Sequence, residues 1–165
     1  MRSKWIIVLC ALFAVQDAIA CGMTSKLVPL ELEAGIKSVQ VAASELPEPV
    51  VVVTEIVRGI GPKHSSCDDT GLLTLMVEWP RGKHKLRDIG FEFKVVAGQT
   101  PYPIFPEGPM QAPSNGRKSD FLFMWREGAP AQQKPIELQV EVRAVARDNQ
   151  RGPPARILIR AAPGG

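Results

Sequence analysis

The segment from Ile136 to Ala144 alternates strictly between apolar and polar side chains, and no other feature restricts the fold of this chain as much. Its apolar members are Ile136, Leu138, Val140, Val142 and Ala144, and its polar members are Glu137, Gln139, Glu141 and Arg143. A period of two places the apolar set on one face of a β-strand. The segment therefore predicts a strand of an antiparallel sheet with one buried and one solvated face.

Other segments repeat this pattern, and none shows the three-to-four-residue period of a helix. The 15 prolines are spread over the chain after its first 20 residues, which also opposes helices. Strands are predicted at residues 27–32, 36–41, 50–57, 72–79, 89–96, 121–125 and 155–161 as well. About eight short strands with turns between them predict an all-β sandwich or barrel, and their uneven spacing favours the antiparallel β-sandwich.

The first 20 residues resemble an export signal. Arg2 and Lys4 precede an apolar run of 11 residues, Trp5 to Val15, and a small-x-small ending at Ala18-Ile19-Ala20. The run is shorter than the roughly 20 residues that a membrane-spanning helix needs. We expect residues 1–20 to be a signal peptide and the product to be exported, either periplasmic or secreted.

Cys21 follows the cleavage motif and leaves two outcomes open. Simple cleavage is favoured; the alternative is a lipoprotein anchored to the membrane through a lipidated Cys21. After cleavage, Cys21 and Cys67 are the cysteines that remain. In an oxidising compartment an unlipidated pair predicts one disulfide, which closes a loop of about 45 residues and contributes roughly 4 kcal/mol in the chain-entropy model. With a lipidated Cys21, Cys67 is expected to be a small buried side chain.

Length and net charge limit the number of domains and the class of partner that the exported chain can have. Removal of 20 of the 165 residues leaves the size of one domain, and its net charge falls from +3 to +2 because the leader carries two basic residues and one acid. This charge is too small to predict a nucleic-acid partner.

Three segments resemble the fibronectin type III family of immunoglobulin-like sandwiches. They are 72–80 (LLTLMVEWP), 89–97 (IGFEFKVVA) and 140–159 (VEVRAVARDNQRGPPARILI), which look like that family's strands B, C, F and G. The Trp79-Pro80 pair stands where the family closes strand B with its core tryptophan. Leu138 replaces the F-strand tyrosine, so no tyrosine corner is expected. The resemblance implies an immunoglobulin-like domain over residues 47–165, preceded by an extension with extra short strands at 21–46.

Residues with catalytic or metal-binding chemistry are few. His64 lies three positions before Cys67, and Asp68 and Asp69 follow, which is a spacing that a thiol nucleophile with its base or a metal site could use. Neither arrangement matches a motif with a defined mechanism. We expect a non-catalytic protein with no metal and no cofactor.

If the chain folds as a sandwich, two basic loops lie at the same end of it. Residues 80–87 join strands B and C, residues 147–152 join F and G, and such loops emerge at the same pole. The candidate binding residues are Arg81, Lys83, His84, Lys85, Arg87, Arg147 and Arg151. Together they favour a polyanion such as lipopolysaccharide, an acidic polysaccharide or a phospholipid surface, with His84 adding charge at mildly acidic pH. The alternative is a solvated turn.

Two further groups of residues have alternative interpretations. In the proline-rich stretch 98–120, Tyr102, Ile104 and Phe105 either fold back as a lid on the sheet, which is favoured, or form an exposed contact patch. Trp79, Trp125 and four phenylalanines either line a carbohydrate platform or, as their period of two favours, belong to the core.

These observations lead to one functional expectation and one rival. We expect an exported interaction or structural module of the bacterial cell envelope, with an envelope protein or a polyanion as partner. The rival is a module that binds anionic glycans or lipids through the basic loops.

Overall fold

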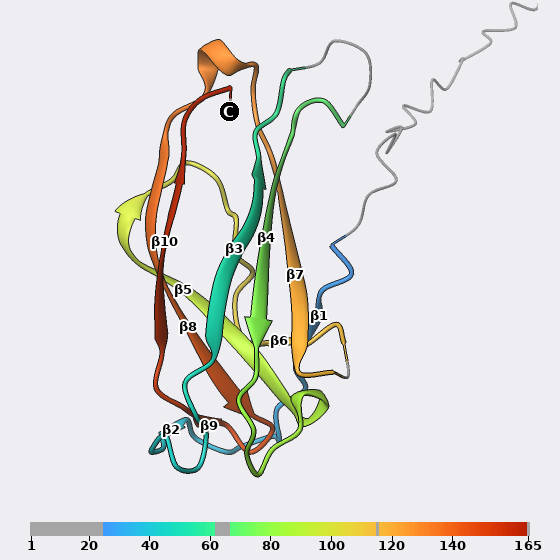
Figure 1. Cartoon of the computed structure of the whole chain (residues 1–165), viewed down its shortest axis with the longest axis vertical. Coiled ribbons are helices and arrows are strands. Elements are labelled where there is room, and N and C mark those ends of the chain that lie inside the picture. Colours follow the sequence, from blue (N-terminus) through green and yellow to red (C-terminus); the bar gives the residue numbers. More distant parts are fainter. Residues whose placement is uncertain (1–24, 62–66, 115, 165) are drawn as a thin grey trace, which may run out of the picture.

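Two β-sheets packed face to face make up the described part of the computed structural model, which comprises residues 25–61, 67–114 and 116–164 (Figure 1). The strands of the smaller sheet, in order, are β3 (Val50–Val57), β4 (Thr70–Glu78) and β7 (Lys118–Arg126). Helical structure in these ranges is limited to the 3₁₀ turns η1 (Leu86–Asp88) and η2 (Pro130–Gln132). The all-β prediction is confirmed.

The larger sheet is built around two long strands. These are β5 (Ile89–Gln99) and β8 (Ile136–Ala146), which pair antiparallel from Ile89↔Ala146 to Gln99↔Glu137. The shorter strands of this sheet are β1 (Val28–Pro29), β2 (Val39–Gln40), β6 (Met110–Gln111), β9 (Gln150–Arg151) and β10 (Ala155–Ala161). β6 and β1 extend the sheet beyond β5, while β10 and β9 pair with the other edge of β8.

The alternating sequences form the strands that face the interior. Along β4, Leu73, Leu75 and Val77 are fully buried, and the intervening side chains point outward. The predicted limits of β3 and β10 agree with the structure, whereas β5 and β8 extend further than predicted. Position 71 in β4 requires glycine, because a Cβ there would lie 2.2 Å from the ring of Trp125.

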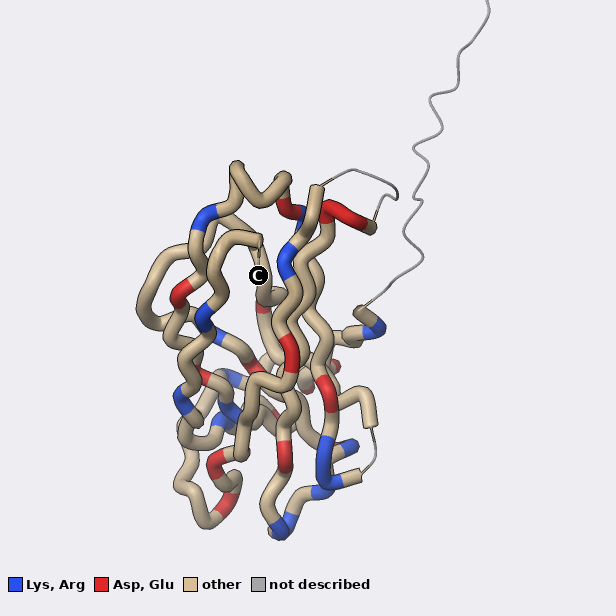
Figure 2. The backbone as a smooth tube through the Cα atoms, turned by 45° about the horizontal axis from the view of Figure 1, so that its top comes forward, with Lys and Arg blue, Asp and Glu red and all other residues tan. Residues whose placement is uncertain are grey.

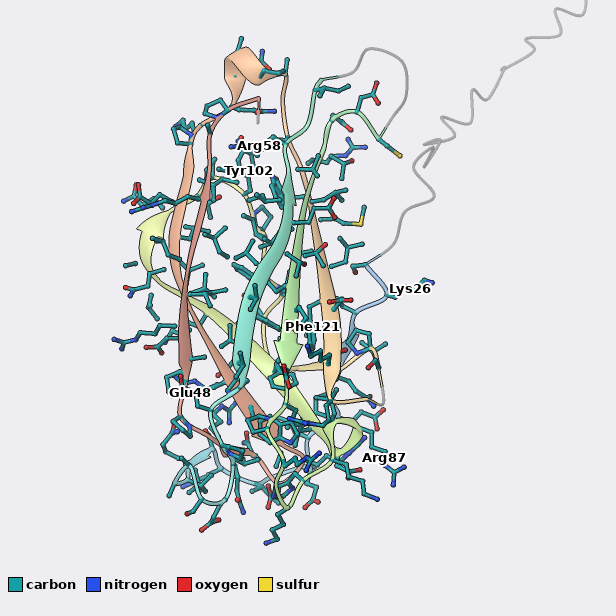
Figure 3. All side chains as sticks on the ribbon, in the orientation of Figure 1. Lys26, Glu48, Arg58, Arg87, Tyr102 and Phe121 are labelled. Atoms are coloured by element: carbon teal, nitrogen blue, oxygen red, sulfur yellow. The ribbon has the colours of Figure 1, made fainter. Side chains whose placement is uncertain are left out.

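Aromatic side chains from both sheets meet in the centre of the sandwich, where Figure 3 labels Phe121. Phe91 packs edge-on against Trp79 and Phe121 with centroid distances of 5.9 and 5.7 Å, and Phe93 contacts Phe123 at 4.9 Å. Trp79 is 2% exposed. The core interpretation of these aromatics is confirmed, since buried rings cannot form a carbohydrate platform.

The proline-rich stretch folds back onto the sandwich, as the lid interpretation predicts. Ile104 is buried, Phe105 lies 4.9 Å from Phe123 between ring centroids, and Tyr102 lies 6.2 Å from Trp125. The stretch also contributes β6 and the first residues of β7, which the sequence did not indicate.

The N-terminal extension contains two short strands within the predicted ranges 27–32 and 36–41, each shorter than predicted. β1 and β2 contain two residues each and do not pair with one another. β1 joins β6, whereas β2 runs parallel to β9 at the other side of the sheet. Between them the chain crosses one end of the sandwich, where Glu33 N donates to Arg147 O at 2.8 Å and Asn149 Nδ2 donates to Ile36 O at 2.8 Å. Polar contacts with the β8–β9 turn therefore hold this segment.

Candidate functional site

One end of the sandwich gathers the β4–β5 and β8–β9 connections, at the bottom of Figure 1. The pairing of Ile89 with Ala146 places the beginning of β5 beside the end of β8. The connection before β7 reaches the same end, because Trp79 N donates to Arg117 O at 2.7 Å. Residues 78–88 and 116–118 are referred to below as the basic pole.

Two buried apolar side chains fix the β4–β5 connection. Trp79 closes β4, and its Nε1 donates to the carbonyl oxygen of His84 at 2.9 Å. Leu86, in η1, is 3% exposed. Between these anchors Arg81, Lys83 and Lys85 point to solvent, and His84 is half-buried. The loop thus holds its cations on an ordered backbone.

The ion pairs at the basic pole are weak, and several cations have none. Arg117 Nη2 lies 3.3 Å and Lys118 Nζ 3.5 Å from the carboxylate of Glu78. Arg87 Nε lies 3.7 Å from Asp88, with both side chains more than half exposed. Within the described ranges, no carboxylate forms an ion pair with Arg81, Lys83 or Lys85. Exposed pairs of this kind contribute at most about 1 kcal/mol, so these cations stay accessible to a partner.

The basic pole holds the whole excess of positive charge of the protein. Its cations are Arg81, Lys83, Lys85, Arg87, Arg117 and Lys118, against the carboxylates of Glu78 and Asp88. This leaves +4 with neutral histidine, whereas the complete chain has a formal charge of +3. Figure 2 shows the corresponding blue segments at the lower end of the backbone. The remainder of the chain is close to neutral, so the charge is concentrated in space.

A hollow of about 330 Å³ opens beside Trp79 in this surface. Its lining combines apolar and cationic side chains with two glycines: Trp79, Pro80, Arg81, Gly82, His84, Lys85, Leu86, Arg87, Gly116 and Arg117. Arg117 comes from the connection before β7, and its Nε donates to the carbonyl oxygen of Trp79 at 3.3 Å. Two segments distant in sequence therefore form one cavity.

Arg147 and Arg151, the two candidates on the second predicted loop, lie outside the hollow. Arg147 is exposed at the same end, but neither it nor Arg151 lines the hollow. Arg151 bonds to Ser38 Oγ at 2.7 Å, and its Nε lies 3.5 Å from the carboxylate of Glu92 on β5. The charge of Arg151 is therefore balanced locally, and the structure separates it from the cluster around the hollow.

Acidic and basic side chains alternate on the outer face of the larger sheet next to Arg151. Glu141 accepts from Arg156 Nη2 at 2.8 Å and from Arg143 Nη2 at 2.9 Å. The hydrogen bond from Arg156 lowers the pKa of Glu141; partial burial opposes the shift, and Arg143 adds to it. Because Arg143, Arg151 and Arg156 each have an acidic partner, this region has less unbalanced charge than the basic pole.

The remaining sequence candidates add no site within the described residues. Cys21 and His64 lie outside those residues, so the Cys21–Cys67 disulfide stays a prediction. The described Cys67 lies just before β4 and its carbonyl accepts from Thr70 N at 3.0 Å. No group of three metal-ligating side chains occurs in the described ranges, and no helix there is long and apolar enough to cross a bilayer.

The sequence did not indicate Arg117 and Lys118 as members of the site. They precede a strand whose start was predicted at Phe121, inside a stretch that its prolines indicated to be irregular.

No family model, no curated protein and no solved structure matches this chain.

Proposed function

We propose that this chain is a non-catalytic, exported interaction module that binds anionic partners at the basic pole. The observation that carries this proposal is the concentration of charge, since +4 lies in residues 78–88 and 116–118 of a chain with +3 overall. Like charges held together on fixed loops create a local potential that attracts polyanions. A solvated turn needs no such accumulation, because one or two lysines keep an edge soluble.

The order of the strands supports an immunoglobulin-like fold of the fibronectin type III kind. With β3, β4 and β7 taken as strands A, B and E, the smaller sheet has the order of that family's first sheet. β5, β8 and β10 then take the places of C, F and G in the second sheet. Domains with this architecture commonly present loops from one end as a binding surface. The basic pole consists of such loops.

Export to the bacterial cell envelope belongs to the same proposal. The sequence of residues 1–20 supports it, with the product periplasmic or secreted and a lipid anchor on Cys21 as the alternative. In that location the abundant anions are lipopolysaccharide, acidic polysaccharides and phospholipid headgroups, and acidic patches on envelope proteins offer the same charge. We favour the polyanions, because several exposed cations gathered on one surface suit a partner that carries many negative charges.

Retention on immobilised heparin and on lipopolysaccharide tests the proposal. The mature protein should bind both at low ionic strength. Elution should follow salt concentration, because the Debye length falls from about 30 Å at 0.01 M to about 10 Å at 0.1 M. An uncharged dextran column of the same matrix is the control. A protein that passes through both anionic columns at 0.01 M salt would contradict the proposed function.

A further inference from the structure

The geometry points to a discrete site for a phosphate monoester in the hollow beside Trp79, an inference that rests on the proposed function of the basic pole. The proposed function needs only a diffuse positive surface. The hollow adds a defined shape. Mutations can distinguish the discrete site from the diffuse surface, because some cations of the basic pole line the hollow and others do not.

Four of the six cations line the hollow, and two do not. The lining cations are Arg81, Lys85, Arg87 and Arg117, while Lys83 and Lys118 lie outside it. Three of the four lining cations are arginines. A guanidinium offers parallel N–H donors that match two oxygens of a phosphate, a geometry that an ammonium group cannot provide. The composition of the lining therefore favours phosphate recognition over simple charge attraction.

Two long hydrogen bonds orient the half-exposed side chain of Arg117 before any ligand arrives. Its Nε donates to Trp79 O at 3.3 Å, and its Nη2 donates to Glu78 Oε1 at 3.3 Å. The backbone of the same residue accepts from Trp79 N at 2.7 Å. A fixed side chain loses less conformational freedom on binding than a free one, which favours affinity.

The walls and the size of the hollow limit what can enter it. Trp79 and Leu86 are buried and form its apolar wall. Gly82 leaves the backbone open, since a Cβ there would meet only Pro47 at 3.9 Å. Its volume of about 330 Å³ is small. Sites for small molecules span about 300–1,000 Å³, so the hollow has room for one phosphate on a sugar-sized body.

The charge of the ligand follows from the charge of the lining. A phosphate monoester carries about −1.5 to −2 near pH 7 and has three free oxygens. A phosphodiester carries one negative charge and has two free oxygens, so it accepts hydrogen bonds from fewer of the N–H groups that line the hollow. Sugar phosphates in solution and lipid headgroups that end in a monoester share this chemistry.

Four single variants separate the discrete site from the diffuse surface. Lys85→Gln and Arg117→Gln remove lining cations, and Lys83→Gln and Lys118→Gln remove their neighbours outside the hollow. The probe is glucose 1-phosphate, titrated into the mature protein by calorimetry. We expect the first two variants to weaken binding by at least about tenfold and the second two by less than about twofold. Equal weakening by all four would overturn the discrete site.

Vesicles distinguish the sources of the phosphate. Phosphatidylcholine vesicles that contain phosphatidic acid present a monoester, and those that contain phosphatidylglycerol at matched surface charge present a diester. Binding of glucose 1-phosphate, tighter binding of the phosphatidic acid vesicles than of the phosphatidylglycerol vesicles, or both supports the inference and names the source. Equal binding of the two vesicle types without binding of the sugar phosphate would overturn it. If all these probes fail while salt-dependent retention on heparin persists, the discrete site is wrong and the proposed function stands.

Discussion

Arg58 and Glu127 form an ion pair in which both side chains are fully buried, at the end of the sandwich opposite the basic pole. Arg58 Nη2 lies 2.7 Å from Glu127 Oε1, and Nε donates to the same oxygen at 2.7 Å. Figure 3 labels Arg58 near the upper end and Arg87 near the lower end. The pair joins the end of β3 to the end of β7.

All donors and acceptors of this pair have partners. The Nη1 of Arg58 donates to the carbonyl oxygens of Ala161 and Ala162 at 3.1 and 3.0 Å, and Nη2 donates to Lys134 O at 2.9 Å. Glu127 also accepts from Trp125 Nε1 at 3.0 Å and from Gly59 N at 2.9 Å. The network ties both sheets together at this end.

Removal of one partner should be strongly destabilising. Glu127→Gln keeps the size of the side chain but leaves the Arg58 charge buried without its counter-ion, so we expect a loss of about 3–5 kcal/mol in the free energy of unfolding. Denaturant titration at pH 7 measures it. The matched control is Glu137→Gln, whose pair with Arg160 is about two-thirds exposed and should contribute less than about 1 kcal/mol. Similar losses in both variants would contradict the assigned role.

The stability contributed by Glu127 should depend on pH in the acidic range. Burial raises the pKa of Glu127, but hydrogen bonds from Arg58, Trp125 and Gly59 together lower it below its ordinary value of 4.5. A lowered folded-state pKa stabilises the protein above the unfolded-state pKa, and this stability is lost as the pH falls. Denaturation midpoints between pH 6 and pH 3 should therefore fall less steeply for Glu127→Gln than for the wild type. Parallel curves would count against this explanation.

Trp79 should be important for both the core and the basic pole. Trp79→Ala leaves a cavity between the sheets and should cost about 3–5 kcal/mol of unfolding free energy. The change also removes the donor to His84 O, so the β4–β5 connection loses an anchor. Denaturant titration measures the first effect, with Leu158→Ala as a control because Leu158 is 50% exposed. A midpoint equal to that of the wild type would place Trp79 outside the core.

The predicted disulfide has a direct chemical test. Alkylation of the unfolded, unreduced mature protein should find no free thiol, and alkylation after reduction should find two. The expectation follows from the oxidising compartment and the pair Cys21 and Cys67. One thiol before reduction, together with a diacylglycerol-sized increase in mass at the amino terminus, would favour the lipoprotein instead.

The period of two in the sequence was sufficient to predict the main strands. β8 was located because its inward-facing residues are apolar and most of its outward-facing residues polar, and β10 because apolar residues recur along it between Arg156 and Arg160. The short strands β6 and β9 contain two residues each, so no period can reveal them. The contacts that hold the extension could not be predicted, because its partners Arg147 and Asn149 lie more than 100 positions away in the chain.

The candidate site was predicted in part for a similar reason. The cations of the β4–β5 connection are adjacent in sequence, and the sandwich hypothesis correctly placed them at one end. Arg117 reaches them through backbone pairing with Trp79, which depends on the register of two strands. Likewise, Arg151 has an acidic partner only because β9 lies near Glu92. Such pairings depend on the fold and not on local composition.

Retention on heparin of two charge-matched variants tests the central claim most directly. One variant replaces Arg81, Lys83, Lys85 and Arg87 by glutamine. The other replaces four exposed cations away from the pole, Lys26, Lys94, Arg126 and Lys134. Both change the net charge equally, and exposed charges contribute little to stability. We predict that the first variant elutes at clearly lower salt than the wild type and the second close to it. Equal elution of the two variants would contradict the claim that the basic pole binds the anion.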